Sequence, residues 1–116
     1  MENILLDTLL FDYYNALLTA RQSEVYELYY LQNLSLSEIA REYKITPQAV
    51  RDILARTRKN LLKYEDALGV VRKHGQLNEL KERLGAVEET HRENMNTDVA
   101  KKLREAVEIL EAVMDE

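Results

Sequence analysis

Residues 36–55 of the chain read LSEIAREYKITPQAVRDILA, and this stretch decides the fold. Just before it, Ser35 stands three residues ahead of Glu38, which is the spacing of a capping box. In a capping box each of the two side chains accepts a hydrogen bond from the other residue's backbone amide. The pattern therefore predicts a short helix that starts at this box and ends near Tyr43.

A second start signal follows after a turn of only about three residues. Thr46 can cap a helix, and Pro47 suits its first position, where the missing amide proton costs nothing. From there apolar positions recur every three or four residues, which predicts one long helix to about Lys73, with Gly75 as its stop. The inward positions of this helix are Val50, Ile53, Leu54, Thr57, Leu61, Tyr64, Leu68 and Val71.

The two helices have the residue pattern of a helix-turn-helix. The small residue Ala40 stands where the helices must touch, and Ile39, Ile45 and Val50 supply apolar contacts before, within and after the turn. Many such turns hold a glycine in left-handed conformation, whereas this chain has Lys44 at that place. We expect either a strained lysine or a different turn there.

Two more helices are predicted before this motif. Apolar pairs recur every four residues between Leu5 and Leu18, so the first helix has an apolar face wider than the usual stripe. This face belongs to a central core helix or pairs in part with a second copy of the chain. Thr19 and Gln22 form another capping box, and the helix that it opens should run to about Gln32, with Asn33 as the left-handed stop.

The last forty residues continue the helical period. Apolar residues between Leu77 and Val87 predict one helix, and Thr97-Asp98 can cap a last one, whose apolar positions follow a heptad-like seam of about two repeats. This seam packs within the chain or against a partner. The residues predicted for a dimer or partner interface are Leu5, Leu9, Tyr13, Leu103 and Leu110.

The composition predicts an all-α fold for the whole chain. One Pro and three Gly in 116 residues leave little turn chemistry for a sheet, and good helix formers dominate. We expect a helix-turn-helix domain over residues 1–65, continuing as a long helix to about residue 74, and a C-terminal helical extension over 75–116.

Several function classes are excluded by what the sequence lacks. There is no Cys, there are only two His, and no Gly-rich phosphate loop or nucleophile motif occurs, so we expect no enzyme, no metal and no cofactor. The N-terminus carries an acid in place of a basic signal region, and no apolar run could cross a bilayer. These features predict a cytoplasmic protein with no membrane insertion.

Charge is distributed unevenly along the chain. Residues 37–64 hold seven Lys and Arg against three Asp and Glu, whereas residues 1–36 have a net charge of −4 and residues 65–116 a net charge of −5. The only basic stretch thus coincides with the helix-turn-helix. The acidic flanks would repel a nucleic-acid backbone unless they point away from it.

The basic stretch supplies a predicted nucleic-acid-binding surface. A helix-turn-helix inserts the start of its second helix into the major groove, where Gln can pair with adenine and Arg with guanine. By position, the residues that would meet base edges are Thr46, Gln48, Arg51 and Asp52, and those that would contact phosphates are Arg41, Lys44, Arg56, Arg58, Lys59 and Lys63. The alternative is a solvated face on a protein-interaction adaptor or dimerising scaffold.

Residues 1 to about 65 resemble the YlxM family of bacterial helix-turn-helix proteins, whose genes accompany those of the signal recognition particle. The residues and motifs that carry the resemblance are Asp12-Tyr13-Tyr14, Leu17-Leu18-Thr19, Gln22, Tyr26, Leu28-Tyr29-Tyr30, Ser35-Leu36-Ser37-Glu38-Ile39-Ala40, Gln48-Ala49-Val50 and Arg56-Thr57. The block around Glu38 is also similar to region 4 of bacterial sigma factors.

This resemblance implies an all-helical, sigma-region-4-like regulatory protein. Its expected role is that of a non-enzymatic nucleic-acid-binding regulator or accessory component of the signal recognition particle pathway. The expected partners are the particle's RNA or the operon's DNA, the particle's GTPase, and a second copy in a homodimer. The residues leave open whether DNA or RNA is preferred.

Overall fold

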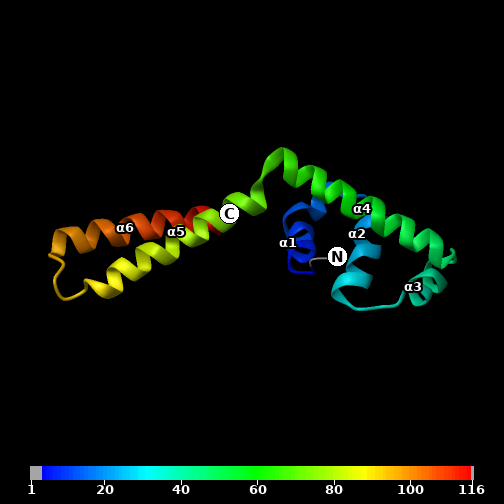
Figure 1. Cartoon of the computed structure of the whole chain (residues 1–116), viewed down its shortest axis with the longest axis horizontal. Helices are drawn as coiled ribbons and strands as arrows, with labels where there is room; N and C mark the ends of the chain where they lie inside the picture. The colour runs from blue at the N-terminus through cyan, green and yellow to red at the C-terminus, as the bar shows by residue number, and fades with distance from the viewer. Residues whose placement is uncertain (1–3, 116) are drawn as a thin grey trace. The chain divides into compact units, whose positions relative to one another are not determined.

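Residues 4–115, the part of the chain that this computed structural model describes, fold into helices joined by short turns (Figure 1). The predicted all-α class is confirmed. The elements are α1 (Ile4–Tyr14), the 3-10 helix η1 (Asn15–Leu17), α2 (Ala20–Tyr26), the π-helix η2 (Glu27–Leu31), α3 (Leu36–Tyr43), α4 (Pro47–Leu68), α5 (Val70–Thr90) and α6 (Thr97–Met114).

The helix starts at Ala20, Leu36 and Pro47 are those that the capping signals predict. Thr19 with Gln22 and Ser35 with Glu38 form complete capping boxes, and the Thr46 hydroxyl accepts a hydrogen bond from the Ala49 amide at 3.0 Å. Each cap satisfies amide groups that have no partner inside the helix. Asn33 has a positive φ of 59°, as predicted for the stop after the second helix.

The chain divides into two compact units, Met1–Val71 and Arg72–Glu116. In the first unit α4 packs against α1, α2 and α3 (Figure 1). The fully buried side chains of its core include Leu10, Val25, Tyr26, Ile39, Val50 and Leu61. Burying one such aliphatic side chain contributes about 2 kcal/mol, so the core that these helices share stabilises the unit.

Two predicted boundaries are wrong. The long helix does not reach residue 73 or 74, because Gly69 adopts a left-handed conformation with φ 64° and ends α4 at Leu68. Gly75 does not end a helix, because it lies inside α5. The cap of the last helix is Asn96 in place of Thr97, since the Asn96 side chain accepts the Val99 amide at 2.8 Å.

A network of hydrogen bonds explains why the break falls at Gly69. The Tyr14 hydroxyl donates to Glu65 Oε1 at 2.6 Å and accepts from the Val70 amide at 3.0 Å, and the Val71 amide donates to the same Glu65 oxygen at 2.9 Å. These bonds satisfy the first amides of α5 and attach the end of α4 to α1. Apolar periodicity alone contains no sign of them.

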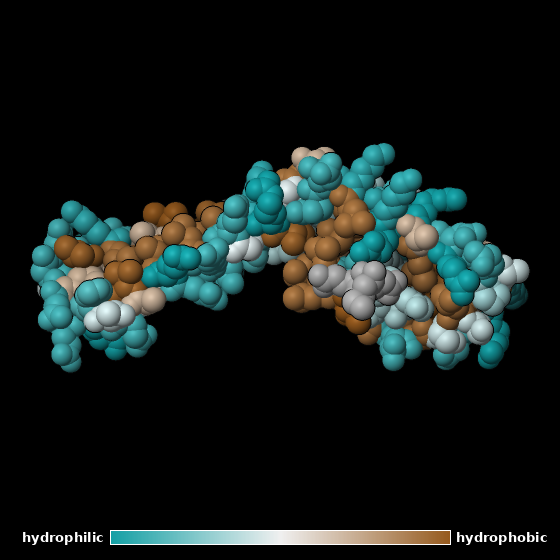
Figure 2. Space-filling view, viewed as in Figure 1, coloured by the Kyte–Doolittle hydropathy of each residue, from teal (hydrophilic) through white to brown (hydrophobic). Residues whose placement is uncertain are grey.

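The second unit is a two-helix hairpin with a small interior. Its buried side chains among the described residues are Val107 and Leu110, both on α6, whereas α5 buries none. An ion pair joins the two helices, with Arg104 Nη2 at 2.8 Å from Glu88 Oε1. Figure 2 shows hydrophobic residues at the surface of this hairpin.

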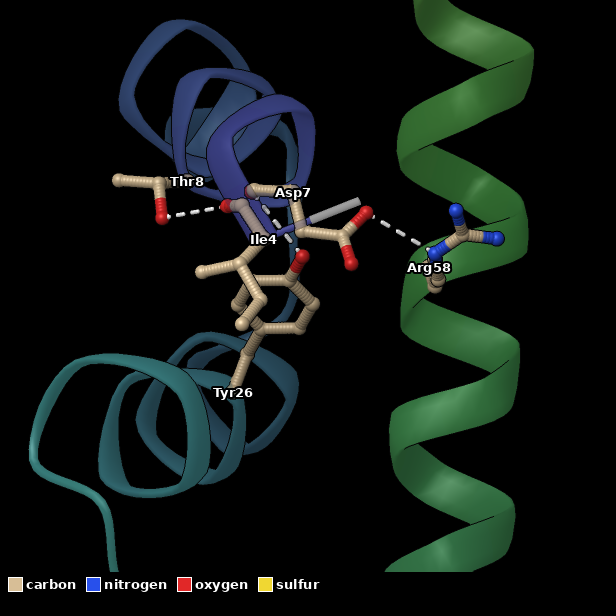
Figure 3. A network of polar contacts seen from close by, with 5 residues as sticks. All are labelled: Ile4, Asp7, Thr8, Tyr26 and Arg58. Carbon is tan, nitrogen blue, oxygen red and sulfur yellow. Dashed lines mark hydrogen bonds and ion pairs between the residues drawn. The ribbon is translucent and has the colours of Figure 1, made fainter. Parts of the chain in front are cut away.

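A buried ion pair connects α1 to α4 (Figure 3). Arg58 Nε donates to Asp7 Oδ1 at 2.9 Å, and the Asp7 side chain is fully buried while 31% of the Arg58 side chain is exposed. The Tyr26 hydroxyl also donates to the Asp7 backbone carbonyl at 3.0 Å. The pair with Asp7 is the main cause of a raised pKa of Arg58. This contact fixes the register of α1 along α4.

We predict that Arg58→Met destabilises the protein by about 3 kcal/mol, because it leaves a buried carboxylate without its cation. The matched change Arg56→Met, at an exposed position half a turn away, should alter stability by about 0.5 kcal/mol or less. Urea denaturation of the two variants measures the difference. Equal stabilities would show that the Asp7 contact contributes nothing.

Candidate nucleic-acid interface

The turn between α3 and α4 is held by backbone hydrogen bonds around a strained lysine. Lys44 has φ 57° and ψ 44°, so it takes the left-handed conformation that glycine adopts more easily. The Ile45 amide donates to the Ala40 carbonyl at 3.0 Å, which ends α3. Of the two alternatives that the sequence left open, the structure has the strained lysine.

Small and apolar residues bring α3 close to α4. Ala40 is 3% exposed, and Ile39 and Val50 are fully buried in the common core. The face of α4 that contains Val50, Leu54, Thr57 and Leu61 is buried, as the periodicity predicts. The opposite face of α4 is consequently turned to solvent.

Six of the seven Lys and Arg in the basic stretch are exposed, and they line the turn and the outer side of α4: Arg41, Lys44, Arg51, Arg56, Lys59 and Lys63. Within residues 4–115 no Asp or Glu forms an ion pair with any of them. Figure 2 shows hydrophilic residues along the outer edge of α4. We call these six residues the cationic ridge.

The residues predicted to meet base edges lie together at the start of α4. Gln48 Nε2 donates to Asp52 Oδ1 at 3.0 Å, and Arg51 Nη1 donates to Gln48 Oε1 at 3.4 Å. All three side chains are exposed. The exposed Thr46 is different, because its hydroxyl oxygen already caps the helix. The first two turns of α4 thus present one linked polar cluster to solvent.

Arg58 is not placed as the helical wheel indicates. The wheel puts it on the outer face with the other cations, whereas the structure pairs its guanidinium with buried Asp7. Sequence reasoning did not single out Asp7. The available signal was a carboxylate placed between two apolar pairs, Leu5-Leu6 and Leu9-Leu10, on an otherwise apolar helix.

A tyrosine of α3 anchors this helix to α2. The Tyr43 hydroxyl donates to Glu24 Oε2 at 2.8 Å, and the Arg21 guanidinium carbon lies 5.3 Å from the centre of the Tyr43 ring. Burial and this hydrogen bond raise the pKa of Tyr43 to about 12, so the hydroxyl keeps its proton at neutral pH. Glu24 therefore pairs with Tyr43 and forms no ion pair with a residue of the cationic ridge within residues 4–115.

A groove of about 490 Å³ lies along α4 and was not foreseen from the sequence. Its walls come from η2, the start of α3 and three turns of α4. The lining residues are Tyr29, Tyr30, Leu36, Arg51, Leu54, Ala55, Arg58, Lys59 and Leu62. No acidic side chain lines it. Two members of the cationic ridge, Arg51 and Lys59, also line this groove.

The five residues predicted for a dimer or partner interface differ in exposure. Leu5 is 70% exposed and Tyr13 lies at the surface, Leu9 and Leu103 are half-buried, and Leu110 is buried inside the hairpin. On α6, Ile109 and Val113 are 67% and 50% exposed and are thus more exposed than Leu103 and Leu110. Val113 is one of the apolar positions of the predicted seam and Ile109 is not, and neither was predicted as an interface residue.

The described residues contain no group of His, Cys, Asp and Glu that could hold a metal ion. In the same part of the chain no helix is long and apolar enough to cross a membrane.

Comparison with known proteins identifies the family. A family model described as "Putative helix-turn-helix protein, YlxM / p13 like" and named UPF0122 matches residues 1–110. Among curated relatives, a UPF0122 protein of Desulforamulus reducens is 53% identical over 68 residues, which cover 59% of this chain and 58% of the relative. A UPF0122 protein of Listeria innocua is 45% identical over 78 residues, or 67% of this chain and 71% of the relative.

These matches agree with the geometry described above, in which two capped helices pack around a three-residue turn and direct an exposed basic face outward. Helix-turn-helix families are typically non-enzymatic, and membership in such a family suggests a nucleic-acid-binding regulator. The chain belongs to the UPF0122 family of YlxM / p13-like helix-turn-helix proteins.

Proposed function

We propose that this protein is a non-enzymatic nucleic-acid-binding regulator that binds phosphates with the cationic ridge. The observation that carries the proposal is that six exposed Lys and Arg surround the turn and the outer side of α4 and form no ion pairs within residues 4–115. A cluster of exposed cations on a chain of net charge −5 creates a local positive potential that attracts a phosphate backbone.

The linked cluster at the start of α4 supplies the means to read sequence. Gln48 and Arg51 can each form two hydrogen bonds with a base, and Asp52 can accept a hydrogen bond from cytosine. Their mutual hydrogen bonds orient the side chains before a ligand arrives. Phosphate contacts from Arg56, Lys59 and Lys63 would then set the position of the helix on the polynucleotide.

The resemblance to the YlxM family supports a finer assignment. We propose that the protein acts in the cytoplasm as an accessory component of the signal recognition particle pathway. Its ligands would be the particle's RNA or the operon's DNA, and the particle's GTPase would be a further partner. One titration of the purified protein against the particle's RNA and against promoter-containing duplex discriminates between the two nucleic acids.

We predict that the logarithm of affinity falls linearly with the logarithm of salt concentration. Arg56→Gln and Lys63→Gln should each reduce the slope by about 0.9 on a duplex, because each neutralises one phosphate contact. Lys101→Gln, an exposed position on α6, is the matched control and should leave the slope unchanged. Affinity that does not depend on salt would contradict the proposal.

Lys44 should show opposite effects on stability and on binding. Lys44→Gly removes the strain of a left-handed lysine and should stabilise the protein by about 0.5 to 1 kcal/mol. The same change removes a cation from the turn and should weaken nucleic-acid binding a few-fold. Thermal unfolding and a salt titration measure the two effects. Unchanged affinity would exclude Lys44 from the binding surface.

A dimerising scaffold is the second candidate function, and the hairpin of α5 and α6 favours it. Five of its apolar side chains, Leu80, Val87, Val99, Ile109 and Val113, are each 46% or more exposed, while only two are buried. A pair of helices with so few buried side chains gains most of its stability from tertiary contacts with other helices. A second copy of the chain could supply them in a homodimer.

We predict that Ile109→Asp abolishes self-association while it leaves helicity unchanged, because this side chain is 67% exposed within one chain. The control Lys101→Asp places the same residue at an exposed position of α6 without removing an apolar group. Sedimentation and circular dichroism measure the two properties. A wild-type protein that sediments as a monomer would eliminate this candidate.

A further inference from the structure

The groove beside α4 combines aromatic, aliphatic and cationic side chains in a way that no feature of a helix-turn-helix requires. We propose that it is a binding site for one unpaired nucleotide, which makes RNA with a bulged or looped base the preferred ligand. This inference rests on the proposed nucleic-acid function and names its substrate class.

The groove has the size and lining that such a ligand needs. Its volume of about 490 Å³ lies in the range typical of small-ligand sites. Tyr29 and Tyr30 offer aromatic rings, and Leu36, Leu54 and Leu62 complete an apolar surface. Proteins that recognise unpaired bases stack them on aromatic rings or on arginine planes.

Three cations stand beside this apolar surface. Arg51 lies on α4 two turns before the adjacent Arg58 and Lys59, and no Asp or Glu is among the lining residues. Arg58 is held in place by Asp7, so its position is fixed before a ligand binds. A base on the tyrosines would therefore have its phosphate within reach of Arg51 and Lys59, which also belong to the cationic ridge.

The backbone conformation of η2 is a second sign of a site. The Gln32 amide donates to the Glu27 carbonyl at 3.0 Å, five residues earlier, so this turn is wider than an α-helical one. Such π-helical turns are frequent at functional sites. Here the turn contains both Tyr29 and Tyr30, whose rings meet edge to face with centroids 5.0 Å apart.

Lys59 and the position of the groove beside the cationic ridge favour a nucleotide over a protein helix as the occupant. Lysine is depleted at the centre of a protein interface, whereas arginine and tyrosine are enriched there. This groove places Lys59 beside two arginines, of which Arg58 is paired with Asp7. Continuity with the cationic ridge points the same way, because a polynucleotide on the ridge passes the entrance of the groove at Arg51 and Lys59.

The test compares two RNA hairpins. The first has a bulge of one unpaired adenosine, whose base is replaced by the fluorescent analogue 2-aminopurine, and the second is the same hairpin without the bulge. The wild-type protein should bind the bulged hairpin about tenfold more tightly and should change the 2-aminopurine fluorescence. Tyr29→Leu should remove this preference but keep the affinity for the fully paired hairpin. Tyr29→Phe, which keeps the ring, should retain the preference.

Tyr64→Leu is the matched control, because Tyr64 is also half-buried in the first unit but does not line the groove. It should bind both hairpins as the wild type does. Thermal unfolding of all variants shows whether each is folded. If Tyr29→Leu is unstable, Tyr29→Phe still tests the proposal. Loss of the preference for the bulged hairpin in Tyr29→Phe would contradict stacking on the ring.

Two outcomes would overturn the groove proposal and leave the proposed function intact. In the first, the wild type binds both hairpins equally and with the salt dependence of the cationic ridge. In the second, Tyr29→Leu abolishes self-association without affecting either RNA, so the groove is a protein contact. If neither hairpin nor duplex DNA binds at any salt concentration, the proposed function itself fails, and the groove proposal fails with it.

Discussion

The close approach of α3 to α4 at Ala40 is the constraint on which the functional surface depends. A larger side chain at this buried position would push the two helices apart and change the direction of α4 relative to the turn. Because the helices touch there, the Ile45 amide reaches the Ala40 carbonyl, and the turn closes in three residues. The cationic ridge lies on the side of α4 that this packing leaves to solvent, and the buried pair of Asp7 and Arg58 holds α1 against the same helix.

The basic residues of α4 therefore fall into two groups, one that forms an internal ion pair and one that is exposed to solvent. Arg58 acts inside the molecule, where a single carboxylate has withdrawn it from the outer face. The other cations of this helix are exposed to solvent. The groove between η2 and α4 joins the two sets, since fixed Arg58 and exposed Lys59 both line it. A polynucleotide that follows the ridge would thus meet a stacking surface beside its phosphate contacts.

Local signals in the sequence predicted the helix starts, while contacts between distant residues decided what the sequence could not predict. Ser35 with Glu38 and Thr46 with Pro47 are complete within four residues, so their helices begin where expected. The stop at Gly69 depends on Tyr14 and Glu65, which are far apart in the sequence, and periodicity therefore favoured Gly75 wrongly. Contacts between helices were equally unpredictable at the site. Spacing on one helix placed Gln48 and Arg51 together, whereas the partner of Arg58 and the tyrosines of the groove come from other helices.

Under the proposed function, nucleic acid contacts the turn and the outer side of α4. The most direct test is to map amide chemical-shift changes across the assigned protein during titration with the particle's RNA or a promoter duplex at low salt. We expect the largest changes at Lys44, Gln48, Arg51 and Arg56, with α5 and α6 unaffected. Changes confined to α1, or to the hairpin of α5 and α6, would contradict the proposed binding surface.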